Sequence, residues 1–275
     1  MKYRKLGSTG LLVSEIGLGC EGFAEDECRN TKRLLDEAES QGINYFDLYA
    51  SDPKVRASVG EALRGRREKF MIQSHVWSVW KDGQYKRTRN IDEVKAGMEE
   101  MLSLLQTDYI DVGMIHYVDS VKDWHTVADG PVLAYVKELK EKGVIRHIGL
   151  SSHNPEVALE AVKSGDIEVL MFSVNPCYDL QPASEDVEEL WAEKNYKEHL
   201  INMNPERQEL YETCQRLDIG ITVMKAFGGG DLLDEKLSPA GKALTVNQCI
   251  HYALTRPGVS TVLAGARSVE QLRQS

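Results

Sequence analysis

The chain has 275 residues, of which 42% are hydrophobic and 28% charged, values that are typical of a soluble globular protein. Its formal net charge of −10 argues against non-specific binding to nucleic acid, because phosphates would be repelled. No apolar run approaches the roughly 18 residues that span a bilayer, and the five scattered cysteines form no CxxC pair, so we expect a cytoplasmic protein with reduced thiols and no membrane partner.

Short apolar strands alternate with amphipathic helices along the whole chain. The pattern predicts strands at 15–19, 43–47, 70–74, 110–115, 145–150, 169–174, 220–224 and 259–264. It predicts helices near 31–40, 55–64, 91–105, 131–142, 155–163, 205–217 and 243–254, with a short one from 268. Such alternation implies parallel strands joined by right-handed crossovers. Eight units of this kind predict an α/β protein with the (β/α)8 TIM barrel fold, as a single domain over residues 1–275.

The residues between the predicted elements agree with this interpretation. Glycines stand where four of the helices are predicted to end, as C-terminal caps do: Gly42, Gly143, Gly165 and Gly220. The connection from 178 to 204 is long for a compact domain, which indicates either a functional lid or an excursion of the chain.

Polar residues follow nearly every predicted strand, and in a TIM barrel the carboxyl ends of the strands meet at the active site. The residues at these ends are Asp47 and Tyr49, Ser74 and His75, His116 and Tyr117, Ser151 to His153, Asn175, Lys225 with the Gly228–Gly230 turn, and Gly265 to Ser268. Any one of them would also serve as a turn residue. Their shared location favours a functional site.

The last of these clusters has the chemistry of an anion site. A glycine turn at Gly265 is followed by Ser268, which opens a helix and leaves free backbone N–H groups at a positive dipole end. Arg267 adds a guanidinium that can bind a phosphate with two hydrogen bonds. An ordinary capped helix is the alternative interpretation.

Several motifs, in this order, resemble the aldo-keto reductase family over essentially the whole chain. They are 3–7 (YRKLG), 13–19 (VSEIGLG), 42–47 (GINYFD), 106–111 (QTDYID), 143–151 (GVIRHIGLS) and 265–268 (GARS). Within the family, the chain looks most like a prokaryotic branch whose longer members append a ferredoxin-like iron–sulfur segment, and residues 1–275 contain no such segment. The resemblance implies a barrel enzyme that reduces carbonyl compounds with NADPH.

The resemblance also implies a catalytic tetrad of Asp, Tyr, Lys and His, and two positions match it. Asp47 stands at the aspartate position and His116 at the histidine position. The tyrosine position is occupied by Asp52, with Tyr49 nearby, and the lysine position by His75. A histidine is mostly neutral at pH 7 unless a carboxylate favours its protonated form, and Asp47 is the expected partner. The catalytic candidates are therefore Asp47, Tyr49, His75 and His116, with a core position as the alternative for Tyr49.

For the cofactor, the resemblance implies a site for NADP(H). Ser151 matches a serine that binds the nicotinamide carboxamide, whereas Ser152 stands where the family usually has asparagine. The predicted cofactor-binding residues are Ser151, Ser152, Lys225, Gly228, Gly265, Arg267, Ser268 and Gln271. Arg267 and the start of the helix at Ser268 predict a preference for NADPH over NADH.

The expected function is thus an NADPH-dependent oxidoreductase that interconverts a small carbonyl compound and its alcohol. The departures from the tetrad leave an alternative, a nucleotide-binding barrel without ordinary reductase activity that serves as a sensor or redox partner subunit. The branch resemblance alone suggests a third possibility, an iron–sulfur-linked electron-transfer enzyme, and with it a redox partner protein. A metal site built from His75, His116 and His153 is a weaker alternative, and we expect no metal. Four aromatic residues either wall an apolar pocket or pack the loops down: Trp77, Trp80, Tyr85 and Trp124.

Overall fold

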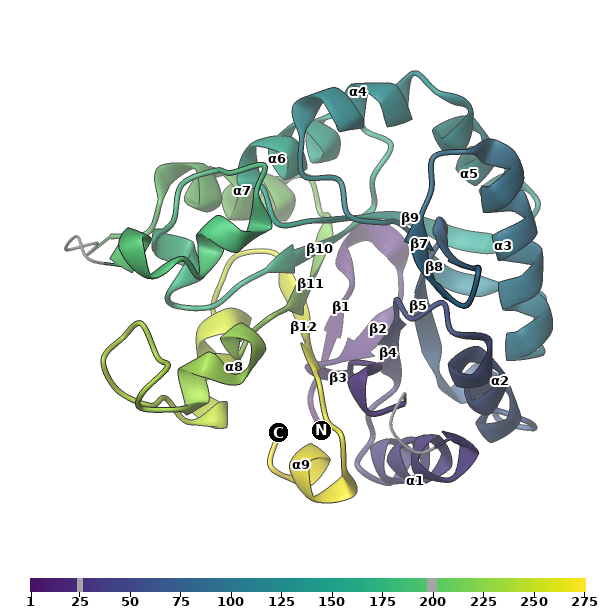
Figure 1. Ribbon diagram of the computed structural model, residues 1–275, viewed down its shortest axis with the longest axis horizontal. Coiled ribbons are helices and arrows are strands. Elements are labelled where there is room, and N and C mark those ends of the chain that lie inside the picture. The colour runs from purple at the N-terminus through teal and green to yellow at the C-terminus, as the bar shows by residue number, and fades with distance from the viewer. Residues whose placement is uncertain (24–26, 197–201) are drawn as a thin grey trace.

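Parallel strands form the centre of the molecule. The computed structural model describes residues 1–23, 27–196 and 202–275, and within them eight parallel strands close in the order β10-β11-β12-β3-β4-β5-β8-β9 (Figure 1). The strands are β3 (Ile16–Leu18), β4 (Tyr45–Leu48), β5 (Met71–His75), β8 (Ile110–Ile115), β9 (Ile145–Ser152), β10 (Val169–Ser173), β11 (Gly220–Met224) and β12 (Val259–Ala264). The predicted (β/α)8 TIM barrel is confirmed.

Helices surround this barrel and connect its strands (Figure 1). They are α1 (Glu27–Ser40), α2 (Pro53–Ala62), α3 (Ile91–Leu105), α4 (Val121–Ala128), α5 (Pro131–Glu141), α6 (Pro155–Lys163), α7 (Pro205–Arg216), α8 (Val246–Leu254) and α9 (Val269–Arg273). Asparagine side chains cap α6 and α7, each just before a proline at the first helical position. In the part of the chain that the structure describes, no helix has the length and apolarity needed to cross a membrane.

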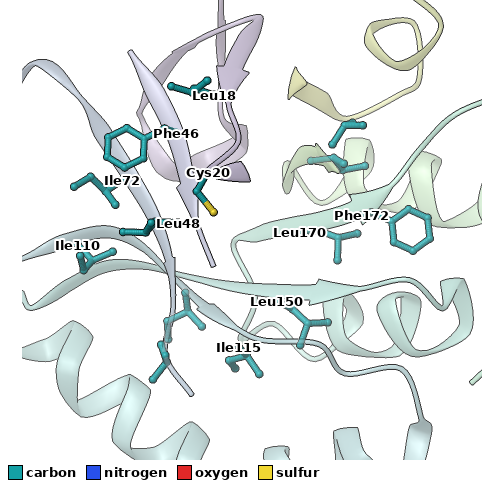
Figure 2. Close-up of a cluster of buried hydrophobic side chains, with 14 of the residues drawn as sticks. Leu18, Cys20, Phe46, Leu48, Ile72, Ile110, Ile115, Leu150, Leu170 and Phe172 are labelled. Atoms are coloured by element: carbon teal, nitrogen blue, oxygen red, sulfur yellow. The ribbon is translucent and has the colours of Figure 1, made fainter. Parts of the chain in front are cut away.

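Strand alternation divides the apolar core into two layers. Side chains such as Phe46, Ile72 and Leu150 belong to the outer layer, which joins the strands to the helices (Figure 2). Tyr45 and Met171 face the barrel interior instead. The hairpin of β1 (Tyr3–Lys5) and β2 (Leu12–Ser14) closes the interior at its amino-terminal end. Leu6, which follows β1, and Val13, in β2, pack into the interior there. The opposite end of the interior is therefore the open one.

The sequence pattern did not predict helix α4. It also did not predict a hairpin of β6 (Ser78–Lys81) and β7 (Gln84–Arg87), which follows β5. Its two-residue turn places Asp82 and Gly83 at φ 54° and 76°, which is the left-handed pair that such hairpin turns require. The hairpin matters for function because it extends from the end of β5 over the open mouth.

The prediction that Gly220 ends a helix is wrong. Helix α7 ends at Arg216, the left-handed residue after it is Asp218, and Gly220 begins β11. A Cβ at Gly220 would lie 2.7 Å from the backbone carbonyl carbon of Leu6. Close approach of the amino-terminal segment, and not helix capping, therefore explains this glycine.

The long connection from 178 to 204 is pinned at its base. It contains short 3-10 turns at Tyr178–Leu180, Val187–Leu190 and Glu193–Tyr196, while residues 197–201 lie outside the described part of the chain. The buried carboxylate of Asp179 accepts hydrogen bonds from the hydroxyls of Tyr211 and Tyr252 at 2.5 and 2.8 Å. The described part of this connection is therefore a loop that hydrogen bonds hold at its start, and not a free lid.

Glu168 tests the electrostatic part of barrel stability. Its carboxylate accepts hydrogen bonds from His147, from the Ile148 N–H and from Lys140. Burial alone would raise its pKa, but these three hydrogen bonds outweigh burial and lower the pKa from 4.5 to about 2. Because the folded-state pKa is the lower one, the stabilisation is complete above pH 4.5 and is lost as the pH falls toward 2.

We therefore expect Glu168→Gln to reduce the free energy of unfolding by about 1–3 kcal/mol at pH 7. The deficit should shrink as the pH falls below 4.5. Urea unfolding at several pH values measures this, with Glu209→Gln in an exposed ion pair to Lys163 as the control. A deficit that does not change with pH would show that packing, and not charge, is lost.

Candidate active site

A cavity of about 340 Å³ opens at the carboxyl ends of the barrel strands. It is lined by Gly19, Asp47, Tyr49, His75, Tyr85, His116, Tyr117, Ser151, His153, Met171, Met224, Lys225 and Leu263. All four residues that we assigned to catalysis border it. A second cavity, of about 370 Å³, lies beside Arg4 and Arg256 at the other end of the barrel, the end that in TIM barrels contributes stability rather than catalysis.

The floor of the cavity is a buried carboxylate with two donors on one oxygen. The Oδ1 atom of Asp47 lies 2.9 Å from Nε2 of His75 and accepts a 2.7 Å hydrogen bond from Nε2 of Gln73. Gln73 in turn accepts from the hydroxyls of Tyr45 and Thr222, at 2.7 and 3.0 Å. All five side chains are buried. Gln73 was missed in the sequence because it lies inside β5, and only the inward direction of alternate strand residues would have indicated it.

His116 packs edge-on against His75, with ring centroids 4.5 Å apart and planes at 90°. Burial, followed by repulsion from His75 and Arg87, lowers the pKa of His116 well below its usual 6.5. The ring is therefore neutral at physiological pH. The indole N–H of Trp77 donates to the backbone carbonyl of His116, so this tryptophan packs the loop down rather than walling the cavity.

Three tyrosines line the cavity: Tyr49, Tyr85 and Tyr117. Tyr49 is 40% exposed, and its ring centroid lies 6.5 Å from that of His75. Tyr85, from the β6–β7 hairpin, places its hydroxyl 2.8 Å from Nε2 of His116. The sequence left open whether Tyr85 lines a pocket or packs a loop, and the structure places it on the cavity wall. Asp52, which the sequence comparison predicts at the tyrosine position of the tetrad, caps α2 by accepting the N–H of Lys54.

A second carboxylate–histidine pair borders the same cavity. Nδ1 of His153 lies 2.9 Å from Asp119, whose other oxygen accepts from the His153 backbone N–H and from Ser152. Burial alone would raise the pKa of Asp119, but the hydrogen bonds from His153 and Ser152 outweigh it and lower that pKa. Asp119 was missed because it follows β8 by four residues, where the sequence gives no strand-end signal. His153 lines the cavity and orients toward Asp119.

Two residues of this cavity have a strained backbone. Tyr117 and Lys225 both line it, and both adopt left-handed backbone, with φ 56° and 57°. Non-glycine residues take this conformation at an energetic cost that functional sites often carry. The ring of Tyr117 lies between His116 and His153 and under the guanidinium of Arg87.

The residues assigned to the cofactor divide into two groups. Ser151 and Lys225 line the cavity, and the Ser151 hydroxyl accepts the backbone N–H of Tyr117. Ser152 is fully buried and donates its hydroxyl to Asp119, and Gly228 is buried in the turn after β11 with φ 62°. Neither of these two lines the cavity.

The closing loop lies beyond the end of β12. Gly265 and Arg267 are exposed there. Ser268 caps α9 by accepting the N–H of Gln271, and the Gln271 side chain accepts the N–H of Arg267. These contacts are those of a capped helix, with the guanidinium of Arg267 at the protein surface.

The three histidines at the cavity do not form a metal cluster. Among the residues that the structure describes, no group of three or more His, Cys, Asp and Glu side chains is arranged to hold a metal ion. Two of the three imidazoles bind carboxylates instead, His75 on Asp47 and His153 on Asp119. The three-histidine alternative gains no support.

The molecule is a TIM barrel with a buried Asp–His pair and a second histidine at its mouth, and comparison with known proteins specifies the family. Residues 15–244 match the model of the Aldo/keto reductase family. The chain belongs to this family and is an oxidoreductase.

Its relatives span almost the same length. The chain is 31% identical to the uncharacterized oxidoreductase YqkF of Bacillus subtilis, over 100% of this chain and 90% of the relative. It is 26% identical to L-galactose dehydrogenase of Arabidopsis thaliana, over 100% and 87%. Among solved structures, an aldo-keto reductase from Bacillus halodurans in its holo form matches with a TM-score of 0.76 and 26% identity, over 99% of this chain and 89% of that one.

Gln73 allows a test of the network under the site. In Gln73→Leu the buried hydroxyls of Tyr45 and Thr222 lose their acceptor and Asp47 loses one donor. Unsatisfied buried polar groups destabilise, and we expect the free energy of unfolding to fall by about 1–3 kcal/mol. Urea denaturation measures it, with Gln208→Leu on the exposed face of α7 as the matched control. Equal stability of the two variants would show that the network contributes nothing.

Proposed function

We propose that the protein is an NADPH-dependent oxidoreductase that interconverts a small carbonyl compound and its alcohol in this cavity. The observation that carries the proposal is the convergence of the Asp47–His75 pair and neutral His116 in one cavity at the mouth of an aldo-keto reductase barrel. Asp47 orients His75, and a protonated His75 would stabilise negative charge that develops at the mouth. A hydroxyl there supplies the proton for the carbonyl oxygen, and the tetrad comparison indicates Tyr49.

The chemistry of the cavity fits a nicotinamide cofactor. Met171, Met224 and Leu263 offer apolar contacts for a flat ring, and Ser151 offers a hydroxyl for its carboxamide. Bound there, reduced nicotinamide supplies a hydride to the carbonyl carbon. Lys225 lines the same cavity and adds a positive charge to it. Ser152 contributes indirectly by holding Asp119, and Gly228 by shaping the turn after β11.

The closing loop suits the 2′-phosphate of NADP(H). Arg267 supplies an exposed cation, next to Gly265 and the capped start of α9 at Ser268 and Gln271. A redox partner protein and a cytoplasmic location stay predictions from the sequence. The alternative of a nucleotide-binding barrel without ordinary reductase activity draws its support from His75 and Asp52, which stand at the lysine and tyrosine positions of the tetrad.

Arg267→Ala tests the cofactor assignment. A charged hydrogen bond to a phosphate contributes roughly 1.5–3 kcal/mol. We therefore expect NADPH affinity to fall by about 10- to 100-fold and NADH affinity to stay nearly the same. Titration followed by nicotinamide fluorescence measures both, with Arg64→Ala at an exposed site as the control. Equal losses for the two nucleotides would refute the assignment.

His75 tests the supporting charge. A lysine side chain keeps its positive charge to high pH, so His75→Lys should extend carbonyl reduction toward alkaline pH. His75→Ala should lower kcat more than it raises KM, because the interaction forms mainly in the transition state. The measurement is a pH–rate profile of the wild type and both variants. Identical profiles would show that the charge at this position plays no part.

A further inference from the structure

The hydroxyl of Tyr85, on the β6–β7 hairpin, contacts a buried imidazole of the cavity. It lies 2.8 Å from Nε2 of His116, and both residues line the cavity. Tyr85 is 43% exposed. A side chain in this position can reach both the imidazole and a substrate that enters the cavity.

The hairpin holds this hydroxyl in a fixed place. The Asp82–Gly83 turn sets the register that pairs Tyr85 with Trp80 across the two strands. On the α3 side, Lys86 and Thr88 both donate to the carboxylate of Glu93, at 2.7 and 2.6 Å. Lys81 on the partner strand pairs with the same carboxylate. Both strands of the hairpin are thus tied to one helix, which is the preorganisation that proton transfer requires.

The surroundings of His116 determine which group in the contact is the donor. Among the described residues, Nδ1 of His116 is buried and has no hydrogen-bond partner. A proton on Nδ1 would be a buried N–H without an acceptor, which is costly, whereas a lone pair there is tolerated better. The single proton of the neutral ring therefore lies on Nε2 and is donated to the Tyr85 oxygen. The hydroxyl proton of Tyr85 is then left for another acceptor.

The loop after β4 offers two other candidates. Asp52 is committed to capping α2 through the Lys54 N–H. Tyr49 also lines the cavity, and its ring lies edge-on to His75 at a centroid distance of 6.5 Å. The backbone carbonyl of Tyr49 accepts from the Ser78 hydroxyl, so this residue helps to anchor the hairpin that carries Tyr85.

We propose that Tyr85 is the catalytic acid, and that neutral His116 is a positioning residue that acts through it; this inference rests on the proposed function. As a hydride adds to the carbonyl carbon, the C=O π electrons move to oxygen and the oxygen takes the Tyr85 hydroxyl proton. The phenolate that remains accepts a hydrogen bond from the Nε2–H of His116. Solvent restores the proton at the exposed mouth, and alcohol oxidation runs the same transfer in reverse.

Burial raises the pKa of Tyr85 above its usual 10, which keeps the phenol protonated and able to act as an acid at neutral pH. The positive charges of Arg87 and Arg89 act in the opposite direction, because they stabilise the phenolate. Tyr85 is thus protonated before the reaction, and the negative charge that develops on its oxygen in the transition state is stabilised.

The kinetic test compares three Tyr→Phe variants on a panel of small aldehydes and ketones with NADPH. Tyr85→Phe should lower kcat by about 10²- to 10⁴-fold with little change in KM. Tyr49→Phe should lose less, and Tyr135→Phe, on α5 far from the cavity, should behave as the wild type. An unimpaired Tyr85→Phe, or a larger loss in Tyr49→Phe, overturns the inference and leaves the proposed function standing. A wild type that reduces no carbonyl overturns both.

The tautomer of His116 gives a second readout, and its measurement needs no cofactor and no turnover. Long-range ¹⁵N–¹H correlation spectra of the histidine rings at pH 7 should show His116 as the neutral Nε2–H tautomer, assigned by its loss in His116→Gln. Tyr85→Phe should shift the Nε2 resonance. His116→Gln, which keeps an N–H donor, should retain more activity than His116→Ala. An Nδ1–H tautomer, a doubly protonated ring or equal losses in the two variants would refute the role given to His116.

Discussion

A negative charge buried inside the barrel is the constraint around which the site is organised. The Asp47 carboxylate is 2% exposed, so it needs donors within the protein, and Gln73 and His75 both approach its Oδ1 atom. The bond to His75 fixes that imidazole, and His116 packs edge-on against it. The other end of Gln73 ties in the hydroxyls of Tyr45 on β4 and Thr222 on β11. The floor of the site and the interior of the barrel are therefore one hydrogen-bond network, and a change in either is felt in the other.

The hairpin after β5 adds what the barrel floor does not supply. Strand ends give the site its buried imidazoles and carboxylates, while the mouth receives its aromatic residues from loops. A TIM barrel tolerates such additions because loop changes leave the strand scaffold intact. In this chain, Glu93 on α3 fastens the hairpin through Lys81, Lys86 and Thr88. Both strands of the hairpin that carries Tyr85 are therefore fastened to α3.

The sequence predicted the barrel because strand and helix periodicities repeat eight times, and it placed Asp47, His75 and His116 at the mouth because parallel strands share one carboxyl end. It carried two further signals that our interpretation did not use. Asp82–Gly83 between alternating residues is a strong hairpin signal, and Ser120 with Asp123 marks the start of α4. The contact between Tyr85 and His116 joins residues 31 apart and depends on the twist and tilt of the hairpin, which no local pattern specifies. The pairing of Asp119 with His153 is beyond sequence reasoning for the same reason.

If Tyr85 is the acid, the residues at positions 75 and 52 form one coupled change from the tetrad that the sequence comparison predicts. The imidazole of His75 is held on Asp47 and packs edge-on against two rings, His116 at a centroid distance of 4.5 Å and Tyr49 at 6.5 Å. Of these two, His116 is the one that contacts the hydroxyl of Tyr85. A histidine at position 75 therefore suits an acid that a second imidazole positions, and the hairpin carries that acid. With Asp52 engaged as the cap of α2, a site that had His75 but lacked Tyr85 would have a supporting group without an acid on this path.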